Sequence, residues 1–160
     1  MTTTTNIGAR REGMKARAFA PCALACLGWL SLASAVEAQP IQQYKNGACT
    51  SSKICTIDFL TTPTGKRIEV TNVSCYLRVT GSSELHAMQF LVAQGSSIVS
   101  AFTVEPRLIG GAPGTSYVYA ANHPVFAYAT AGRRLQAYVE LKQGAFSQFA
   151  CHISGQMVPA

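Results

Sequence analysis

Three histidines and a small number of carboxylates are the groups in this chain that could carry acid–base chemistry. Glu84 and His86 are two residues apart, so on a strand they would share a face and could act as a general acid and base. His123 stands between Asn122 and Pro124, where both neighbours indicate a turn, and a histidine in a loop is free to bind or to catalyse. We name Glu84, His86 and His123 as candidate catalytic residues.

The rest of the sequence gives this chemistry little support. A histidine that shares a strand face with Met88 and Phe90 is typical of a partly buried structural residue, and no G-x-S-x-G nucleophile motif is present. Few carboxylates are available for the paired-acid chemistry of glycoside hydrolysis. We therefore favour a protein that is not an enzyme. The alternative is a small hydrolase acting on an envelope or extracellular polymer, with His86 or His123 working beside Glu84.

A polar strand face is the candidate for ligand binding. In the run 134–142, apolar residues alternate with polar ones, which indicates a strand with one core face and one wet face. If a three-residue loop at 143–145 makes a hairpin, Ala137 pairs with Cys151, and His152 joins the wet face. The residues expected on this face are Gln136, Tyr138, Glu140, Gln148 and His152.

Aromatic residues suggest a second binding surface. Four of them could form a platform for sugars, namely Tyr117, Tyr119, Phe126 and Tyr128. A two-residue hairpin turn at Ala131-Gly132, however, would place Tyr128 opposite the core residue Leu135. We therefore predict that Phe126 and Tyr128 face the core.

Four of the six cysteines follow the N-terminal segment, and an even number of cysteines in a small exported domain indicates disulfides. Four cysteines allow three connectivities. Spacing and strand placement favour Cys49 with Cys55 and Cys75 with Cys151. The C-x5-C spacing is not that of a zinc site, so we expect neither a metal nor another cofactor.

Residues 1–38 are predicted to be a signal peptide. Arg10, Arg11, Lys15 and Arg17 precede the uncharged apolar run 18–35, and Val36-Glu37-Ala38 supplies a cleavage site before Gln39. A retained membrane anchor is the alternative, because 18 residues lie at the lower limit for spanning a bilayer. We expect cleavage, no stable membrane span after it, and a secreted or periplasmic location.

Residues 39–160 carry nine basic and five acidic side chains, a net charge of +4. The basic residues form no run longer than two, whereas binding of nucleic acid needs a clustered basic surface. A nucleic-acid partner is therefore not expected. Weak attraction to an anionic surface such as a cell envelope stays open.

Short β-type runs separated by turn signals fill residues 54–158, and no amphipathic helix is indicated. This spacing predicts one all-β domain over 39–160, an antiparallel β-sandwich of jelly-roll type with about eight to nine strands. In the run 67–79 the apolar residues change from even to odd positions. A bulge near Thr71-Asn72, or a strand that crosses between sheets, would explain that change.

The stretches 70–77 (VTNVSCYL) and 149–158 (FACHISGQMV) resemble small uncharacterised exported proteins of soil and plant-associated bacteria. The resemblance supports the Cys75–Cys151 pairing and a bacterial envelope or extracellular setting, and it implies no activity. We expect an exported, non-enzymatic protein that binds a ligand or a surface partner outside the cytoplasm. A purely structural surface protein is a further alternative.

Overall fold

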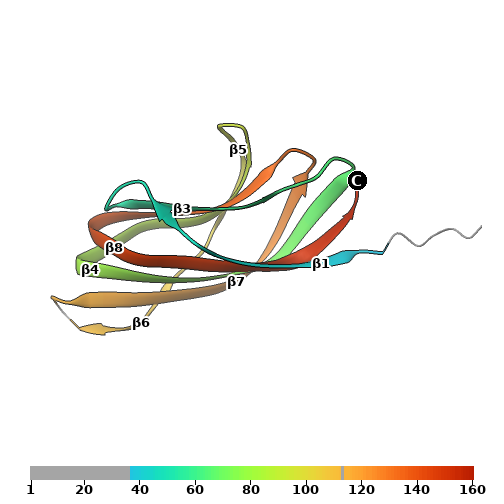
Figure 1. The fold of residues 1–160 in the computed structure, drawn as a ribbon. Coiled ribbons are helices and arrows are strands. Elements are labelled where there is room, and N and C mark those ends of the chain that lie inside the picture. The colour runs from blue at the N-terminus through green and yellow to red at the C-terminus, as the bar shows by residue number, and fades with distance from the viewer. Residues whose placement is uncertain (1–36, 113) are drawn as a thin grey trace, which may run out of the picture. The chain divides into compact units, whose positions relative to one another are not determined.

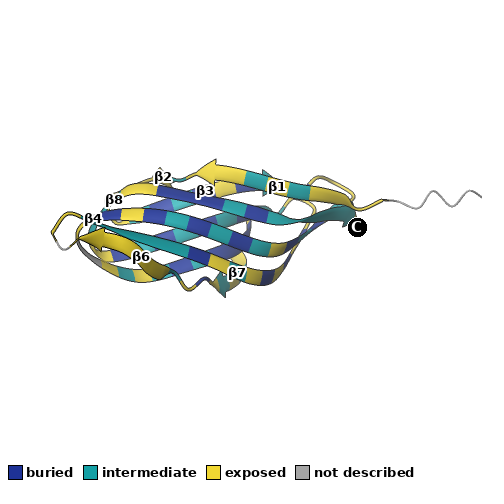
Figure 2. Ribbon diagram, turned by 90° about the horizontal axis from the view of Figure 1, so that it is seen from below, coloured by how far each residue is buried: buried dark blue, intermediate teal, exposed yellow. Residues whose placement is uncertain are grey.

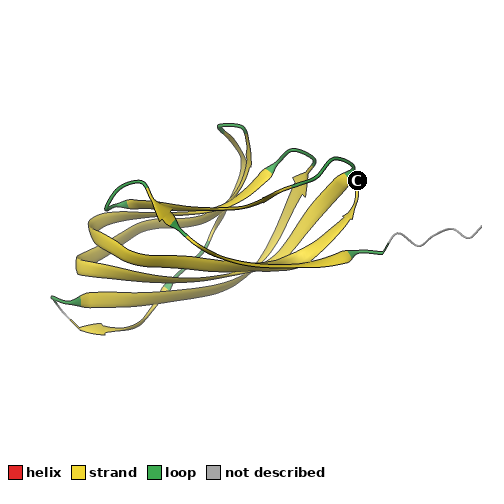
Figure 3. Cartoon of the chain, in the orientation of Figure 1, coloured by secondary structure: helices red, strands yellow, loops and turns green. Residues whose placement is uncertain are grey.

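The structure is a computed structural model that describes residues 37–112 and 114–160, and the side chains of all these except residues 82 and 83 (Figure 1). The predicted signal peptide lies almost wholly outside these residues. The described part contains eight strands and no helix (Figure 3), so none of it forms an apolar helix of membrane-spanning length. The strands are β1 (Gln39–Asn46), β2 (Ala48–Cys49), β3 (Ile54–Thr61), β4 (Lys66–Gln94), β5 (Ser97–Thr103), β6 (Arg107–Ala112), β7 (Ser116–Thr130) and β8 (Arg134–Pro159).

All eight strands belong to one antiparallel sheet. The order is β2-β3-β8-β4-β7-β6, with β1 also paired to β8 and β5 also paired to β4. The predicted all-β antiparallel fold is thus confirmed. The two separate sheets of a jelly-roll sandwich are not confirmed, because the hydrogen bonding of the described strands is continuous from β2 to β6.

The two longest strands, β4 and β8, bend together and give the sheet two layers (Figure 1). At the bend Thr80 pairs with Ala145, and Glu84 pairs with Gln143. Gly81 (φ 83°) and Gly144 (φ 89°) adopt there a left-handed backbone conformation that other residues rarely take. The residues Gly81-Ser82-Ser83 are typical of a turn, and a hairpin loop was predicted at 143–145. Neither turn is formed, because β4 and β8 continue through these positions without reversing direction.

We call the two parts the larger and the smaller layer. The larger layer consists of β1, β6, β7 and the segments 66–80 of β4 and 145–159 of β8. The smaller layer consists of β2, β3, β5 and the segments 84–94 and 134–143. Each long strand therefore contributes one half to each layer.

Buried apolar side chains from both layers form one cluster. The larger layer contributes residues such as Val73, Leu77 and Ile153, and the smaller layer contributes Ile57 and Phe90. The predicted change of phase in β4 is confirmed: the register shifts between Val70 and Asn72 against both β7 and β8. Against β8 the extra residue is Thr71, and the odd-numbered residues of β4 that follow it, such as Val73 and Cys75, face the core.

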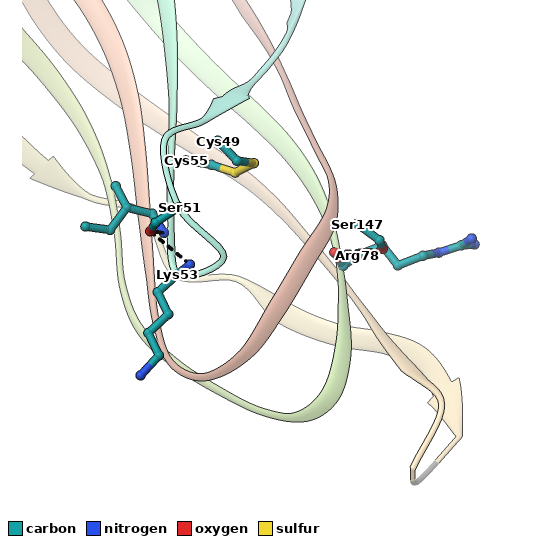
Figure 4. Close-up of a disulfide and its surroundings, with 7 residues drawn as sticks. Cys49, Ser51, Lys53, Cys55, Arg78 and Ser147 are labelled. Atoms are coloured by element: carbon teal, nitrogen blue, oxygen red, sulfur yellow. Dashed lines mark hydrogen bonds between the residues drawn. A yellow bond between two sulfur atoms is a disulfide. The ribbon is translucent and has the colours of Figure 1, made fainter.

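Both predicted disulfides are present. Cys75 and Cys151 are directly opposite each other on neighbouring strands, with 4.1 Å between their Cα atoms, and both are buried. Cys49 and Cys55 close a short loop before β3 (Figure 4). In that loop the Ser51 hydroxyl accepts hydrogen bonds from the backbone N–H groups of Lys53 (3.1 Å) and Ile54 (3.0 Å), which holds the turn.

The pairing of β7 differs from the prediction. The turn after Thr130 leads from the larger to the smaller layer, so β7 pairs with segment 66–80 of β4 and does not form a hairpin with β8. As a result Ala127 faces the core, whereas Phe126 is 73% exposed and Tyr128 is 54% exposed. The prediction that these two aromatic residues are buried is therefore wrong. Pairing of Ala137 with Cys151 is wrong as well, because β8 is continuous.

Candidate functional site

Of the three candidate catalytic residues, Glu84 and His86 lie close together in the smaller layer, and His123 lies in the larger layer. Glu84 is exposed and forms an ion pair with Lys142 at 2.7 Å. His86 is the extra residue of a bulge, since Leu85 pairs with Leu141 and Ala87 with Glu140. His123 lies inside β7, where it pairs with Val73 of the larger layer, so the expected turn at 122–124 is not formed.

His123 borders two hollows. The larger hollow, of about 500 Å³, lies where the chain crosses from β5 to β6, and it is lined by Ser74, Glu105, Arg107, Ile109, Ala120, Ala121, Asn122 and His123. A second hollow of about 250 Å³ is lined by Phe102, Thr103, His123, Pro124, Val125 and Phe126. The His123 Nδ1 atom lies 2.9 Å from the Pro124 carbonyl oxygen. Glu105 and Arg107 carry no signal in the sequence that predicts this position, because only the crossing of the chain from β5 to β6 brings them beside β7.

The predicted ligand-binding residues divide between the two layers. Gln136, Tyr138 and Glu140 alternate along the smaller layer, where Tyr138 donates a hydrogen bond to Glu140 (2.9 Å) and Gln136 to Asp58 (2.8 Å). Burial and then the bond to Glu140 raise the pKa of Tyr138. Gln148 and His152 belong to the other half of β8, in the larger layer, so the five residues do not form one patch.

His152 instead belongs to a broad polar surface on the outer side of the larger layer, which Figure 2 views face on. Directly paired residues of neighbouring strands point to the same side of a sheet, so the strand register gives rows of neighbouring side chains across β7, β4, β8 and β1. The three central rows are Pro124–Asn72–Ser154–Gln42, Asn122–Ser74–His152–Tyr44 and Ala120–Tyr76–Ala150–Asn46. We call these rows, with the adjoining row Tyr128–Glu69–Gln156–Pro40 and the neighbouring Phe126, the amide–tyrosine face.

The central rows of this face are rich in uncharged hydrogen-bonding groups and contain no Lys, Arg, Asp or Glu. Asn72 Nδ2 donates to Asn122 Oδ1 at 2.9 Å, which orients both amides, and the Tyr44 hydroxyl donates to Asn46 Oδ1 at 3.3 Å. The side chains of Ser74 and His152 form no hydrogen bond with another of the described residues. Their polar atoms are available to a ligand.

At one end of the face, the ion pair of Arg67 and Glu69 lies beside the exposed ring of Tyr128. Glu69 accepts hydrogen bonds from Gln156 and Arg67, each at 2.6 Å, and the Arg67 guanidinium carbon lies 5.8 Å from the centre of the Tyr128 ring. The bond from Gln156, followed by that from Arg67, lowers the pKa of Glu69. The Arg67 guanidinium thus makes a cation–π contact with one side of the Tyr128 ring. Phe126, two residues earlier on the same side of β7, adds a second exposed ring.

Each side of the amide–tyrosine face adjoins a hollow. The hollow at His123 reaches Ser74 and Asn122. On the opposite side a hollow of about 340 Å³ is lined by Pro40, Ile41, Gln42, Thr71, Ser154, Gly155 and Gln156.

Residues 39–46, which form β1, were not predicted to be a strand, because they lack the apolar alternation on which that prediction relies. In the structure the half-buried Ile41 and Gln43 alternate with the exposed Gln42 and Tyr44, a difference that the residue types alone do not show.

No group of three or more His, Cys, Asp or Glu side chains arranged to hold a metal ion exists among residues 37–112 and 114–160. Comparison of the chain with protein-family models, with curated proteins and with solved structures gives no match.

Proposed function

We propose that this chain is an exported protein that binds a ligand outside the cytoplasm without transforming it, and that the amide–tyrosine face is the binding surface. The observation that carries the proposal is the set of uncharged donors and acceptors that the strand register aligns on four neighbouring strands. Strands held by a hydrogen-bonded ladder fix such groups in place, so little entropy is lost on binding.

Several features support a location outside the cytoplasm and a role in binding without catalysis. Two intramolecular disulfides are typical of proteins that work outside the cytoplasm. The basic segment, apolar run and cleavage motif of residues 1–38 agree with export. A binding role is favoured because the predicted acid–base groups Glu84 and His86 are not in the same layer as His123.

A hydrolase remains the second candidate, since Glu105, Ser74 and His123 line one hollow. Acid–base or nucleophilic catalysis would need direct hydrogen bonds between such groups, or bonds formed when substrate binds. No hydrogen bond or ion pair joins His123 to Glu105 among the described residues. The binding role therefore accounts for more of the arrangement than the catalytic one.

Nuclear magnetic resonance of ¹⁵N-labelled protein, recovered from the periplasm or medium of an expressing bacterium, tests this function. The protein is titrated with a panel of oligosaccharides, amino acids, nucleotides and short peptides. We expect shift changes on β1, β7 and segments 66–80 and 145–159 for at least one class of compound, with no turnover. Shift changes confined to the hollow at His123, together with turnover that His123→Ala abolishes, would establish the hydrolase instead.

A further inference from the structure

We infer that the ligand of the amide–tyrosine face is a neutral carbohydrate chain that lies across the strands, from the β7 edge to β1. This inference rests on the proposed function and names its ligand class. It is drawn from three properties of the face: the kind of hydrogen-bonding groups in its centre, the exposed aromatic rings, and the distance between its two hollows.

The central groups match sugar hydroxyls. A hydroxyl both donates and accepts a hydrogen bond, and an amide side chain offers one acceptor oxygen beside two N–H donors. When Asn72 Nδ2 bonds to Asn122 Oδ1, the Asn72 oxygen and the Asn122 nitrogen stay available. Ser74 and His152 add a hydroxyl and a ring nitrogen in the next strands of the same row.

The lack of charge in the central rows selects a neutral ligand. An anionic polymer would be bound most strongly by Arg or Lys side chains paired with its carboxylates, sulfates or phosphates. Among the described residues, the charged groups that border the rows lie outside them. Arg67 and Glu69 pair with each other at one end. Arg107 is paired with Ala120 on the β6 side and lines the hollow beside Asn122 together with Glu105, and Arg78 lies in the row next to Tyr76. A ligand without charge loses less hydration free energy when it leaves water for such a surface.

The aromatic rings match the apolar side of a sugar ring. The faces of Phe, Tyr and Trp offer a flat apolar surface on which the C–H groups of a sugar can pack. Phe126 and Tyr128 are more exposed than is usual for residues of their size, and Tyr44 lies on the same side of the sheet at the far edge, 63% exposed. The Arg67 guanidinium, 5.8 Å from the centre of the Tyr128 ring, favours this position of the ring.

The width of the face suits a chain of sugars. From β7 to β1 there are three strand spacings, about 14 Å in total. A single sugar ring would occupy only one part of this distance, and would leave either the hollow beside Asn122 or the hollow beside Gln42 empty. A short run of sugar units reaches both.

A protein partner fits the face less well. The centre of a protein–protein interface is usually apolar and is surrounded by a polar rim. Here polar side chains make up most of two central rows, including Asn72, Ser74 and His152, while the exposed rings of Phe126 and Tyr128 lie toward one end of the face.

The test is affinity electrophoresis in native gels that contain one soluble polysaccharide each: a neutral glucan, a neutral mannan, a neutral xylan, or anionic polygalacturonate. The protein is the processed form recovered from the periplasm or medium. We expect retardation by at least one neutral polymer, and less by polygalacturonate. Tyr128→Ala and Asn72→Ala should each weaken the retardation about threefold to tenfold, as loss of one stacked ring or one hydrogen-bonded amide implies.

Two control variants lie in the smaller layer. Ile98→Ala removes an exposed apolar side chain of β5, and Gln136→Ala removes an amide that bonds to Asp58. Both should leave the retardation unchanged. Melting temperatures of all variants within a few degrees of the wild type would show that they fold. If Tyr128→Ala does not fold, Tyr128→Phe and Phe126→Leu serve in its place, and only the second should weaken binding.

The outcomes separate the inference from the proposed function. Retardation by none of the three neutral polymers overturns the carbohydrate inference. If peptides or nucleotides nevertheless shift resonances of the face, the proposed function stands. Retardation that Gln136→Ala weakens and Tyr128→Ala does not would overturn both, because the binding surface would then be the smaller layer.

Discussion

Removal of the Cys75–Cys151 disulfide should destabilise the domain far more than removal of the Cys49–Cys55 disulfide. The first bond joins residues 76 apart in the chain, and the second joins residues 6 apart. On the chain-entropy model, the free energy lost on opening is about 4.5 kcal/mol for the long loop and about 2 kcal/mol for the short one. Domains of this size are stabilised by about 5–15 kcal/mol in total, so the long-range bond is a large share.

Urea unfolding measures the difference. Replacing Cys75 and Cys151 by Ala would also leave space in the core, since both side chains are buried. Chemical reduction keeps the sulfur atoms and opens the bond, so the better comparison is the Cys49→Ala/Cys55→Ala variant before and after reduction. With a slope of about 2 kcal/mol per molar urea, reduction should lower its midpoint by roughly 2 M.

The matching experiment reduces a Cys75→Ala/Cys151→Ala variant, in which only the short loop can open. Its midpoint should fall by about 1 M. Equal shifts for the two variants would refute the chain-entropy argument for this sheet. A linked peptide that contains Cys55 and Cys75 in non-reducing mapping would refute the strand register, because β3 does not pair with segment 66–80.

Protein recovered from the periplasm or medium should have the mass of residues 39–160, and a mass that includes residues before Gln39 would contradict cleavage after Ala38. Because the pKa of Glu69 is lowered in the folded state, its network stabilises the protein above the ordinary value of 4.5 and this contribution is lost as the pH falls below it. The melting temperature of the wild type should therefore fall more steeply than that of Glu69→Gln between pH 5 and pH 3, and parallel curves would reject the network. Gly144→Ala should cost about 1–2 kcal/mol, because φ is positive there, and an unchanged urea midpoint would show that the bend tolerates a side chain.

Predictions from the sequence were most reliable for the face on which a residue lies, because this depends only on neighbouring residues along one strand. Alternation placed Cys75 on a core face, and it is buried. The core position of Cys151 was predicted from the hairpin that pairs it with Ala137, and Cys151 is buried although that pairing is wrong. The partner of each strand was harder to predict, because pairing depends on segments far apart in the chain. The hairpin assumed for β7 and β8 therefore turned Phe126 and Tyr128 inward, although the true partner, β4, leaves them outside.

The turns expected at Gly81 and Gly144 were wrong for a different reason, namely that glycine is found in two kinds of backbone geometry. A positive φ is needed both in tight turns and in a strand that bends without reversing. Gly81 and Gly144 are of the second kind, and a Cβ atom added to Gly81 would lie 3.9 Å from the Gly144 Cα atom. A single glycine does not distinguish a turn from a bend. Two glycines on paired strands do, but their proximity is known only after the register of β4 and β8 is known.

The bulge at Thr71 connects the core to the candidate site. Without this extra residue, Val73 and Cys75 would point away from the core, and Asn72, Ser74 and Tyr76 would point into it. With it, the same strand buries a disulfide on one side and presents an amide and a hydroxyl on the other. Stability and the proposed binding surface thus depend on the same backbone irregularity. The phase change that reveals it is visible in the sequence, whereas the polar neighbours from β1, β7 and β8 are brought to it only by the fold.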